Sequence, residues 1–116
     1  MDMKYLLIVT LLAIAKTPAC NKEKLTAIPA RIRQKIDAAK AQPKANPPIE
    51  VQQYTYNGKT VYLISSGCCD QYNVVYDKQC QYICAPSGGL TGKGDRKCAD
   101  FAEKATFVRT VWKDER

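Results

Sequence analysis

The fold of this chain is decided by VQQYTYNGKTVYLI, residues 51–64. Val51–Tyr56 and Lys59–Ile64 are rich in valine, isoleucine, threonine and tyrosine, which favour the extended backbone of a sheet. Asn57-Gly58 stands between them and supplies the two positive φ angles of a type I′ turn. The stretch therefore predicts a β-hairpin, and a chain of 116 residues built around it has room for one domain.

The residues after this hairpin predict a second hairpin and then a long loop. Tyr72–Tyr76 and Cys80–Ala85 are its expected strands, with Asp77-Lys78-Gln79 as the turn between them. Residues 86–97, PSGGLTGKGDRK, contain few apolar groups and four glycines. We expect these glycines to adopt positive φ angles, which they do at little steric cost, in a wrapped loop that Cys98 closes.

The segment before the first hairpin predicts one amphipathic helix. Thr26 is the expected cap, and Pro29 lies in the first turn, where its missing N–H costs little. Apolar side chains recur at helical spacing at Ile28, Ile32, Ile36 and Ala39. Basic side chains lie mostly off this stripe, at Arg31, Arg33, Lys35 and Lys40. The stripe is narrow and has no aromatic anchor, so we expect the helix to dock on the sheet, and to end by Gln42.

These elements add up to an α+β fold. Ala99–Ala105 predicts one helical turn, and Thr106–Trp112 predicts a closing strand. The expected architecture is one N-terminal amphipathic helix packed on a small antiparallel sheet of four or five strands. Such a short chain has a marginal core, so we expect disulfides to stabilise it. The last residues, Lys113–Arg116, are interpreted as a charged tail.

Residues 1–19 have the three parts of a signal peptide. Lys4 supplies the positive charge, Leu6–Ala15 forms the apolar run, and small residues follow. As a helix, the ten-residue run rises only about 15 Å, which is half of a hydrocarbon core, so it predicts export rather than a membrane span. The mature chain is then a polar tether, residues 20–26, followed by one domain, residues 27–116.

Two cleavage sites compete in this segment. Cleavage after Ala13-Ile14-Ala15 follows the small-x-small rule and would release a secreted or periplasmic protein. Thr17-Pro18-Ala19-Cys20 resembles a loose bacterial lipobox, which would make Cys20 the lipidated first residue of an envelope lipoprotein. We favour the lipoprotein, although Lys16 and Pro18 are poor neighbours for that site.

The six cysteines are expected to form disulfides rather than a zinc site, because export leads to an oxidising compartment. The disulfide candidates are Cys68, Cys69, Cys80, Cys84 and Cys98, and Cys20 is a candidate for lipidation or for pairing. Adjacent cysteines rarely bridge each other, and residues four apart on one strand lie about 13 Å apart, beyond disulfide reach. We therefore expect each of the two adjacent cysteines to pair with one of the three that follow. Lipidation of Cys20 would leave one of the five others unpaired.

The chain contains no histidine, so the usual base of serine and cysteine hydrolases is missing. No Cys-x-x-Cys redox pair occurs, and the glycine-rich segment fails the spacing of a phosphate-binding loop. We therefore predict no enzyme, no cofactor and no metal site. The formal net charge of +7 allows weak binding to anionic lipids, glycans or nucleic acids without selecting among them, and no specific nucleic-acid partner is predicted.

Several segments together resemble a known family. They are Ile28-Pro29 with Ile32 and Ile36, YNGKTVYLISSGCCDQYNVVYD, APSGGLTGKGDRKCADF and VWKDER. In these segments the chain resembles a family of small exported bacterial proteins, mainly from Bacteroidota, which is known as a domain of unknown function. The resemblance implies an envelope or secreted location and a cysteine framework, and it assigns no activity. Relatives often carry a cysteine where this chain has Arg31, which implies one unpaired cysteine here unless Cys20 substitutes.

The sequence therefore favours a non-enzymatic envelope or extracellular domain that acts by binding or as a structural accessory, with an unknown partner. The residues expected to bind are Tyr54, Tyr62, Asp70, Lys93 and Asp95, of which the last three form the candidate binding loops. One alternative is a protease inhibitor that presents residues 86–97, although glycines argue against a rigid loop. The other is a thiol-redox protein that uses an unpaired cysteine.

Overall fold

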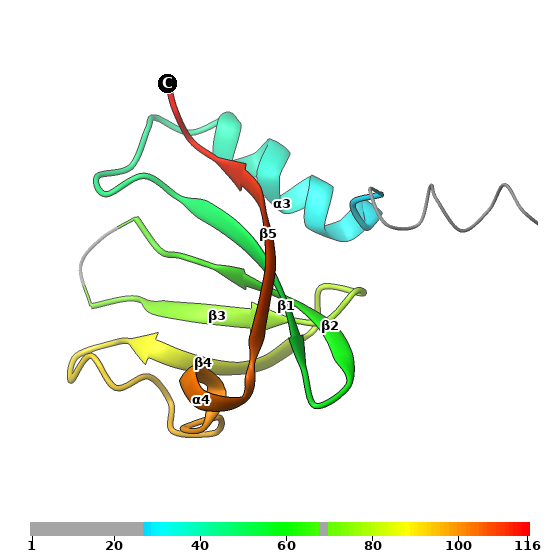
Figure 1. Cartoon of the computed structure of the whole chain (residues 1–116). Coiled ribbons are helices and arrows are strands. Elements are labelled where there is room, and N and C mark those ends of the chain that lie inside the picture. The colour runs from blue at the N-terminus through cyan, green and yellow to red at the C-terminus, as the bar shows by residue number, and fades with distance from the viewer. Residues whose placement is uncertain (1–26, 68–69) are drawn as a thin grey trace, which may run out of the picture.

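The computed structural model describes residues 27–67 and 70–116. These residues form one five-stranded sheet in the order β4-β3-β2-β1-β5, and every neighbouring pair is antiparallel (Figure 1). The elements are α3 (Ala30–Lys40), β1 (Glu50–Tyr56), β2 (Lys59–Ile64), β3 (Tyr72–Tyr76), β4 (Tyr82–Gly88), α4 (Phe101–Lys104) and β5 (Thr106–Lys113). The expected antiparallel sheet, with five strands, is confirmed, and so is the expected disulfide bond. The expected signal peptide and tether, and the cysteines at 20, 68 and 69, lie outside the described residues.

The β1–β2 hairpin forms as the sequence predicts. Tyr56 pairs with Lys59 across the turn, and the register continues to Val51 opposite Ile64. Asn57 and Gly58 have φ angles of 51° and 75°, the two left-handed positions of a type I′ turn. The local sequence thus sets the register of the two central strands without help from distant residues.

The β3–β4 hairpin differs from its prediction at the start of the second strand. Strand β4 begins at Tyr82 and not at Cys80, which has a φ angle of 60° within the turn. Asp77 causes the delay, because its Oδ1 accepts the backbone N–H groups of Gln79 and Gln81, both at 2.9 Å. These bonds fold the backbone around the carboxylate, as in an Asx turn, so that pairing with β3 begins only after Gln81. The strand then continues to Gly88, so residues 86–88 are not part of the loop.

Helix α3 starts at Ala30, with Pro29 at the N-cap, so the proline precedes the first turn instead of lying in it. Thr26, the expected cap, lies outside the described residues. Ile32 and Ile36 are 0% and 5% exposed and form one buried cluster with Val51 and Tyr62. The apolar spacing therefore marks the side of the helix that joins this core cluster.

A second core cluster lies on the opposite face of the sheet, since Val61 and Tyr62 are neighbours on β2 and belong to different clusters. It contains six buried residues: Tyr56, Val61, Val75, Cys84, Cys98 and Phe101. Cys84 of β4 is bonded to Cys98, with their Cα atoms 5.9 Å apart. The expectation that both Cys68 and Cys69 pair with later cysteines is therefore wrong, because this bond uses two of the three and Cys80 is free.

The loop after β4 is braced by its own backbone. Gly94 has a φ angle of 71°, and a Cβ atom there would collide with the carbonyl oxygen of Ala85. The N–H of Gly94 donates to the Gly88 carbonyl at 3.0 Å, and the N–H of Asp95 donates to the Ala85 carbonyl at 2.9 Å. Positive φ angles at all four glycines of residues 86–97, of which Gly88 is the last residue of β4, confirm the prediction. The backbone hydrogen bonds determine the shape of this loop, and the glycines allow the φ angles that it requires.

Candidate functional site

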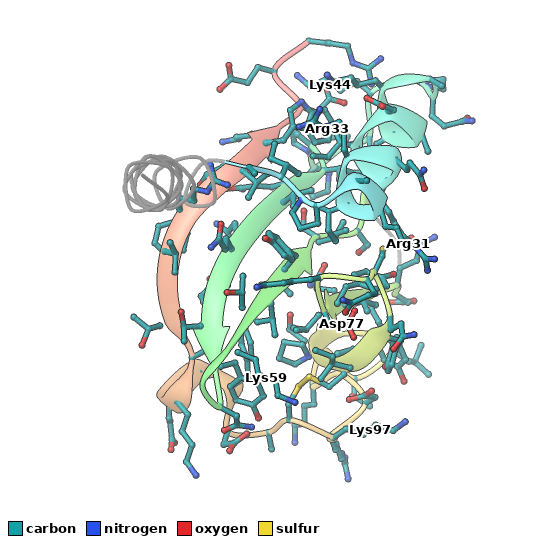
Figure 2. The ribbon with its side chains drawn as sticks, turned by 90° about the vertical axis from the view of Figure 1, so that its right-hand side faces the viewer. Arg31, Arg33, Lys44, Lys59, Asp77 and Lys97 are labelled. Carbon is teal, nitrogen blue, oxygen red and sulfur yellow. A yellow bond between two sulfur atoms is a disulfide. The ribbon has the colours of Figure 1, made fainter. Side chains whose placement is uncertain are left out.

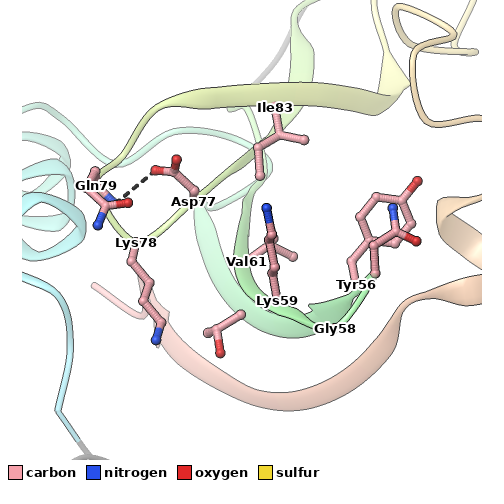
Figure 3. A pocket seen from close by; sticks show the side chains of 10 residues that line it. Tyr56, Gly58, Lys59, Val61, Asp77, Lys78, Gln79 and Ile83 are labelled. Carbon is pink, nitrogen blue, oxygen red and sulfur yellow. Dashed lines mark hydrogen bonds between the residues drawn. The ribbon is translucent and has the colours of Figure 1, made fainter.

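A pocket of about 590 Å³ opens between the turns of the two hairpins (Figure 3). The β1–β2 turn and the start of β2 form one wall, and the β3–β4 turn forms the other. The ten lining residues are Tyr56, Asn57, Gly58, Lys59, Thr60, Val61, Asp77, Lys78, Gln79 and Ile83. Two turns that are remote in sequence thus form one site, because β2 and β3 are paired between them.

The inner surface of this pocket is apolar and belongs to the second core cluster. Val61 is 1% exposed, and Ile83 of β4 packs against the same core cluster. The Tyr56 ring lies 5.2 Å from the Phe101 ring, and its hydroxyl donates to the carboxylate of Asp100. This hydrogen bond, with burial, raises the pKa of Tyr56, so its phenol stays a neutral donor. The pocket therefore combines an apolar floor with an immobilised aromatic wall.

Two lysines give the rim of the pocket its positive charge. Lys59 follows the first turn and Lys78 lies in the second, and both are exposed. Within the described chain, ion pairs link only Lys104 with Asp100 and Arg116 with Asp114. The carboxylate at the rim is Asp77, whose Oδ1 is occupied by two backbone N–H groups. The rim thus offers two cations without carboxylate partners beside an apolar surface, which suits a ligand that has an anionic group.

Helix α3 extends this positive charge beyond the pocket. Arg31 Nη1 donates to the carbonyl oxygen of Gln79 at 3.5 Å. Lys35 Nζ donates to the hydroxyl of Tyr76 at 3.2 Å and lies 4.6 Å from the centre of its ring. Figure 2 faces the side of the molecule on which Arg31, Asp77 and Lys59 lie. We call Arg31, Lys35, Lys59 and Lys78 the basic face.

The binding residues expected from the sequence lie elsewhere. Tyr62 is 3% exposed, and Tyr54 packs between the rings of Phe101 and Phe107, with centroids 5.1 and 5.5 Å away. Asp70 and Lys93 are exposed, but neither lines the pocket. Sequence reasoning missed Lys59 and Lys78 as site residues. Each stands within or directly after a predicted turn, and this position is the signal that could have identified them.

Asp95 holds the glycine-rich loop instead of facing a ligand. Its carboxylate accepts the hydroxyl of Tyr82 and, at 3.0 Å, the backbone N–H of Lys97. The hydrogen bond from Tyr82 lowers the pKa of Asp95 and raises the pKa of Tyr82 to about 12. The pair is therefore a neutral phenol on a carboxylate at neutral pH, and it ties the loop to β4.

The C-terminal residues are not the free charged tail that the sequence suggested. Asp114 is 2% exposed, and Arg116 Nη2 lies 2.7 Å from its Oδ2. Arg116 Nη1 also donates to the Lys40 carbonyl at 2.9 Å, and Nη2 donates to the Gln42 carbonyl at 3.0 Å. Carbonyls at a helix C-terminus have no partner within the helix, so this guanidinium supplies a donor to the last residue of α3 and to Gln42 just beyond it.

Cys80 is the unpaired cysteine among the described residues. Its side chain is partly buried against the cluster that contains Ile32 and Ile36. It also neighbours Gln79, whose carbonyl accepts Arg31. The expectation of one unpaired cysteine, which followed from the family resemblance at position 31, also concerns Cys68 and Cys69, which lie outside the described residues.

The described residues contain neither a membrane-spanning helix nor a group of metal ligands. Residues 27–67 and 70–116 contain no helix that is long and apolar enough to cross a bilayer. The same part of the chain holds no group of three or more cysteine, aspartate or glutamate side chains placed to bind a metal ion.

Comparison with known proteins gives one match. A family model described as a domain of unknown function (DUF6970) matches residues 37–114, which is about two thirds of the chain. No curated protein and no solved structure matches. The matched segment contains both hairpins and therefore the whole pocket, whereas Arg31, Lys35 and Arg116 lie outside it.

Proposed function

We propose that this chain, which belongs to the DUF6970 family, is an exported, non-enzymatic binding domain whose ligand site is the pocket between the two hairpin turns. One observation carries the proposal: two lysines without carboxylate partners stand at the rim of a cavity with an apolar floor. The signal peptide and the cysteine framework support a location in the cell envelope or outside the cell.

The chemistry of the pocket selects a ligand with two parts. An anionic group, phosphate or carboxylate, lies between Lys59 and Lys78. A small apolar or aromatic body rests on Val61 and Ile83 and beside the Tyr56 ring. Burial of the apolar part contributes affinity at any ionic strength, whereas the contribution of the exposed lysines falls as salt screens them.

The protease-inhibitor alternative has less support. The N–H of Gly92 donates to the Gly89 carbonyl at 3.2 Å and closes a tight turn over Leu90 and Thr91. A substrate-like inhibitor segment presents extended backbone to a protease, and this tip is folded back instead. Leu90 is 87% exposed at the tip, but the conformation around it does not suit a protease cleft.

The thiol-redox alternative would depend on Cys80. Cys84 and Cys98, which form the disulfide bond, are only 1% and 3% exposed. The free thiol of Cys80 packs against the core cluster that contains Ile32 and Ile36. A single reactive cysteine must be accessible as its thiolate. Cys80, the unpaired cysteine among the described residues, is only partly exposed, so binding has the better support.

A titration with phenyl phosphate, followed by NMR, tests the site. This probe joins a phosphate to an aromatic ring, as the pocket requires. We expect shifts of the backbone signals of Lys59, Val61, Lys78 and Ile83, and a roughly tenfold or greater loss of affinity in the double variant Lys59→Gln, Lys78→Gln, since two charge-assisted contacts disappear.

The matched control is the double variant Lys93→Gln, Lys113→Gln, which removes the same charge from exposed positions outside the pocket. It should bind phenyl phosphate within about twofold of the parent chain, because exposed charges far from a ligand are screened. Equal weakening by both double variants, or no shifts at the pocket, would reject the proposed site. The location is tested separately by the intact mass of the protein recovered from cells, which shows whether residues 1–19 have been removed.

A further inference from the structure

The basic face draws its side chains from three elements of the fold. Arg31 contacts the β3–β4 turn through the Gln79 carbonyl, and Lys35 contacts Tyr76, the last residue of β3. Lys78 of that turn and Lys59, the first residue of β2, line the same pocket. The four cations, which span residues 31–78 of the sequence, therefore lie at the end of the sheet where both hairpins turn.

Carboxylates do little to neutralise this surface. The one acidic residue that lines the pocket is Asp77, and its Oδ1 is held by the backbone of its own turn. Asp37, the acidic residue of α3, forms no ion pair with any of the four cations within the described chain. Four cations and one carboxylate leave a net positive field, which attracts an extended anionic surface more strongly than a single small anion.

The described chain begins on this same side of the molecule. In Figure 1 helix α3 begins on the right, the side on which the β3–β4 turn also lies, and Figure 2 looks at this side. Residues 20–26 precede it and can span at most about 25 Å when fully extended. A lipid on Cys20 would therefore hold the start of the described chain within about 25 Å of the bilayer, and the basic face would meet the bilayer at a high effective concentration.

We propose that the basic face docks on the anionic surface of a lipid bilayer, so that the anionic group received between Lys59 and Lys78 is the phosphate of a lipid headgroup. This inference rests on the proposed function of the pocket and names the source of its ligand. Peripheral docking of this kind relies on lysine and arginine near the headgroups, each strengthening binding roughly fivefold, and a single lipid anchor needs such a second contact for stable attachment.

Vesicle sedimentation tests the inference on the mature chain carrying Cys20→Ser, so that no covalent lipid contributes. The vesicles are phosphatidylcholine alone, or phosphatidylcholine with about one third phosphatidylglycerol. We expect binding only to the anionic vesicles, and a loss of binding between about 0.05 M and 0.5 M NaCl, where the Debye length falls well below the size of the face. The variant Lys59→Glu, Lys78→Glu should lower the partition coefficient roughly 20-fold or more.

The control variant Lys93→Glu, Lys113→Glu changes the net charge by the same amount outside the basic face. A much smaller loss in this control supports docking through the basic face. Equal losses in both variants, or equal binding to neutral vesicles, would overturn the inference. The phenyl phosphate titration separates the two proposals. Shifts of the pocket signals without binding to vesicles would support the ligand site and reject docking on a bilayer. Binding to vesicles without shifts of the pocket signals would reject the ligand site.

Discussion

At the scale of single residues, two polar side chains near the C-terminus form structural contacts that their position in the sequence does not indicate. Asp114 is almost fully buried, yet each of its carboxylate oxygens accepts a hydrogen bond from Arg116. Its backbone N–H donates to the Ile49 carbonyl at 3.0 Å, next to the start of β1. Burial of a charge is tolerated only where such partners are present. The pair therefore joins the end of the chain to both the sheet and the helix.

This pair predicts how stability depends on pH. Hydrogen bonds from Arg116 lower the pKa of Asp114 from 3.8 to about 2. A carboxyl group with a lowered pKa in the folded state contributes stability that is present above pH 3.8 and is lost as the pH falls toward 2. Urea unfolding of Asp114→Asn should therefore show lower stability than the parent at pH 7 and a shallower decline between pH 4 and 2. Asp37→Asn, at an exposed helix position, is the control, and parallel curves for parent and Asp114→Asn would contradict this assignment.

Two glycines of the braced loop give a matched pair of substitutions. Gly94→Ala should destabilise the fold by about 2 kcal/mol or more, because the left-handed φ angle is combined with a collision against the Ala85 carbonyl. Gly92→Ala meets only the φ penalty of about 1 kcal/mol, since a Cβ atom there has open space around it. Thermal unfolding of the two variants measures the difference. Equal melting temperatures would show that the loop relaxes away from Ala85.

At the scale of elements, the disulfide joins strand β4 to the segment that leads into α4. Cys84 lies within the strand and Cys98 stands just before the helix, and both are buried in the second core cluster. The same cluster holds Phe101 of α4 against Tyr54 and Tyr56 of β1. The covalent bond and the aromatic contacts thus hold one short helix on two different strands.

Removal of this bond should be costly for so small a fold. The double variant Cys84→Ala, Cys98→Ala is expected to lose about 3 kcal/mol in the free energy of unfolding, since the bond closes a loop with a sequence separation of 14 residues. Cys80→Ala is the control, because that cysteine forms no bond. Urea unfolding reports both values. A loss in the control as large as in the double variant would show that packing, and not the covalent link, is responsible.

At the scale of the whole molecule, Arg116 connects segments that are far apart in the chain. Its guanidinium reaches the carbonyls of Lys40 and Gln42, and its own carbonyl accepts Lys44 Nζ at 2.6 Å. These contacts span more than 70 residues of sequence. Closure of the domain therefore depends on a contact between α3 and the residues after β5.

Arg116→Ala should loosen the helix more than the sheet. We expect amide hydrogen exchange to accelerate in the last turn of α3, by roughly tenfold, because the carbonyls of Lys40, at its end, and of Gln42, just beyond it, lose the Arg116 donor. The β1–β2 hairpin should exchange almost unchanged. Arg33→Ala removes the same charge from an exposed position on α3 and is the control. Uniform acceleration through the sheet would contradict the local role of Arg116.

The amino-acid sequence alone determined the parts of this fold that are governed by neighbouring residues. The Asn57-Gly58 turn, the strands on either side of it, the glycine-rich loop and the apolar side of α3 all follow from turn chemistry and periodicity over a few residues. The family resemblance also indicated one unpaired cysteine, although not which one.

Only the tertiary structure decided the features that depend on approach between remote segments. The partner of Cys84, the burial of Asp114, the capping of α3 by Arg116 and the pocket between Lys59 and Lys78 each join residues that local patterns do not relate. The start of β4 also belongs here in part, since the Asp77 turn outweighed the strand preference of the residues after it. The physical reason is that these contacts join side chains from segments far apart in the chain. Which segments meet depends on how the whole sheet and its connections are arranged, and no short stretch of sequence determines that.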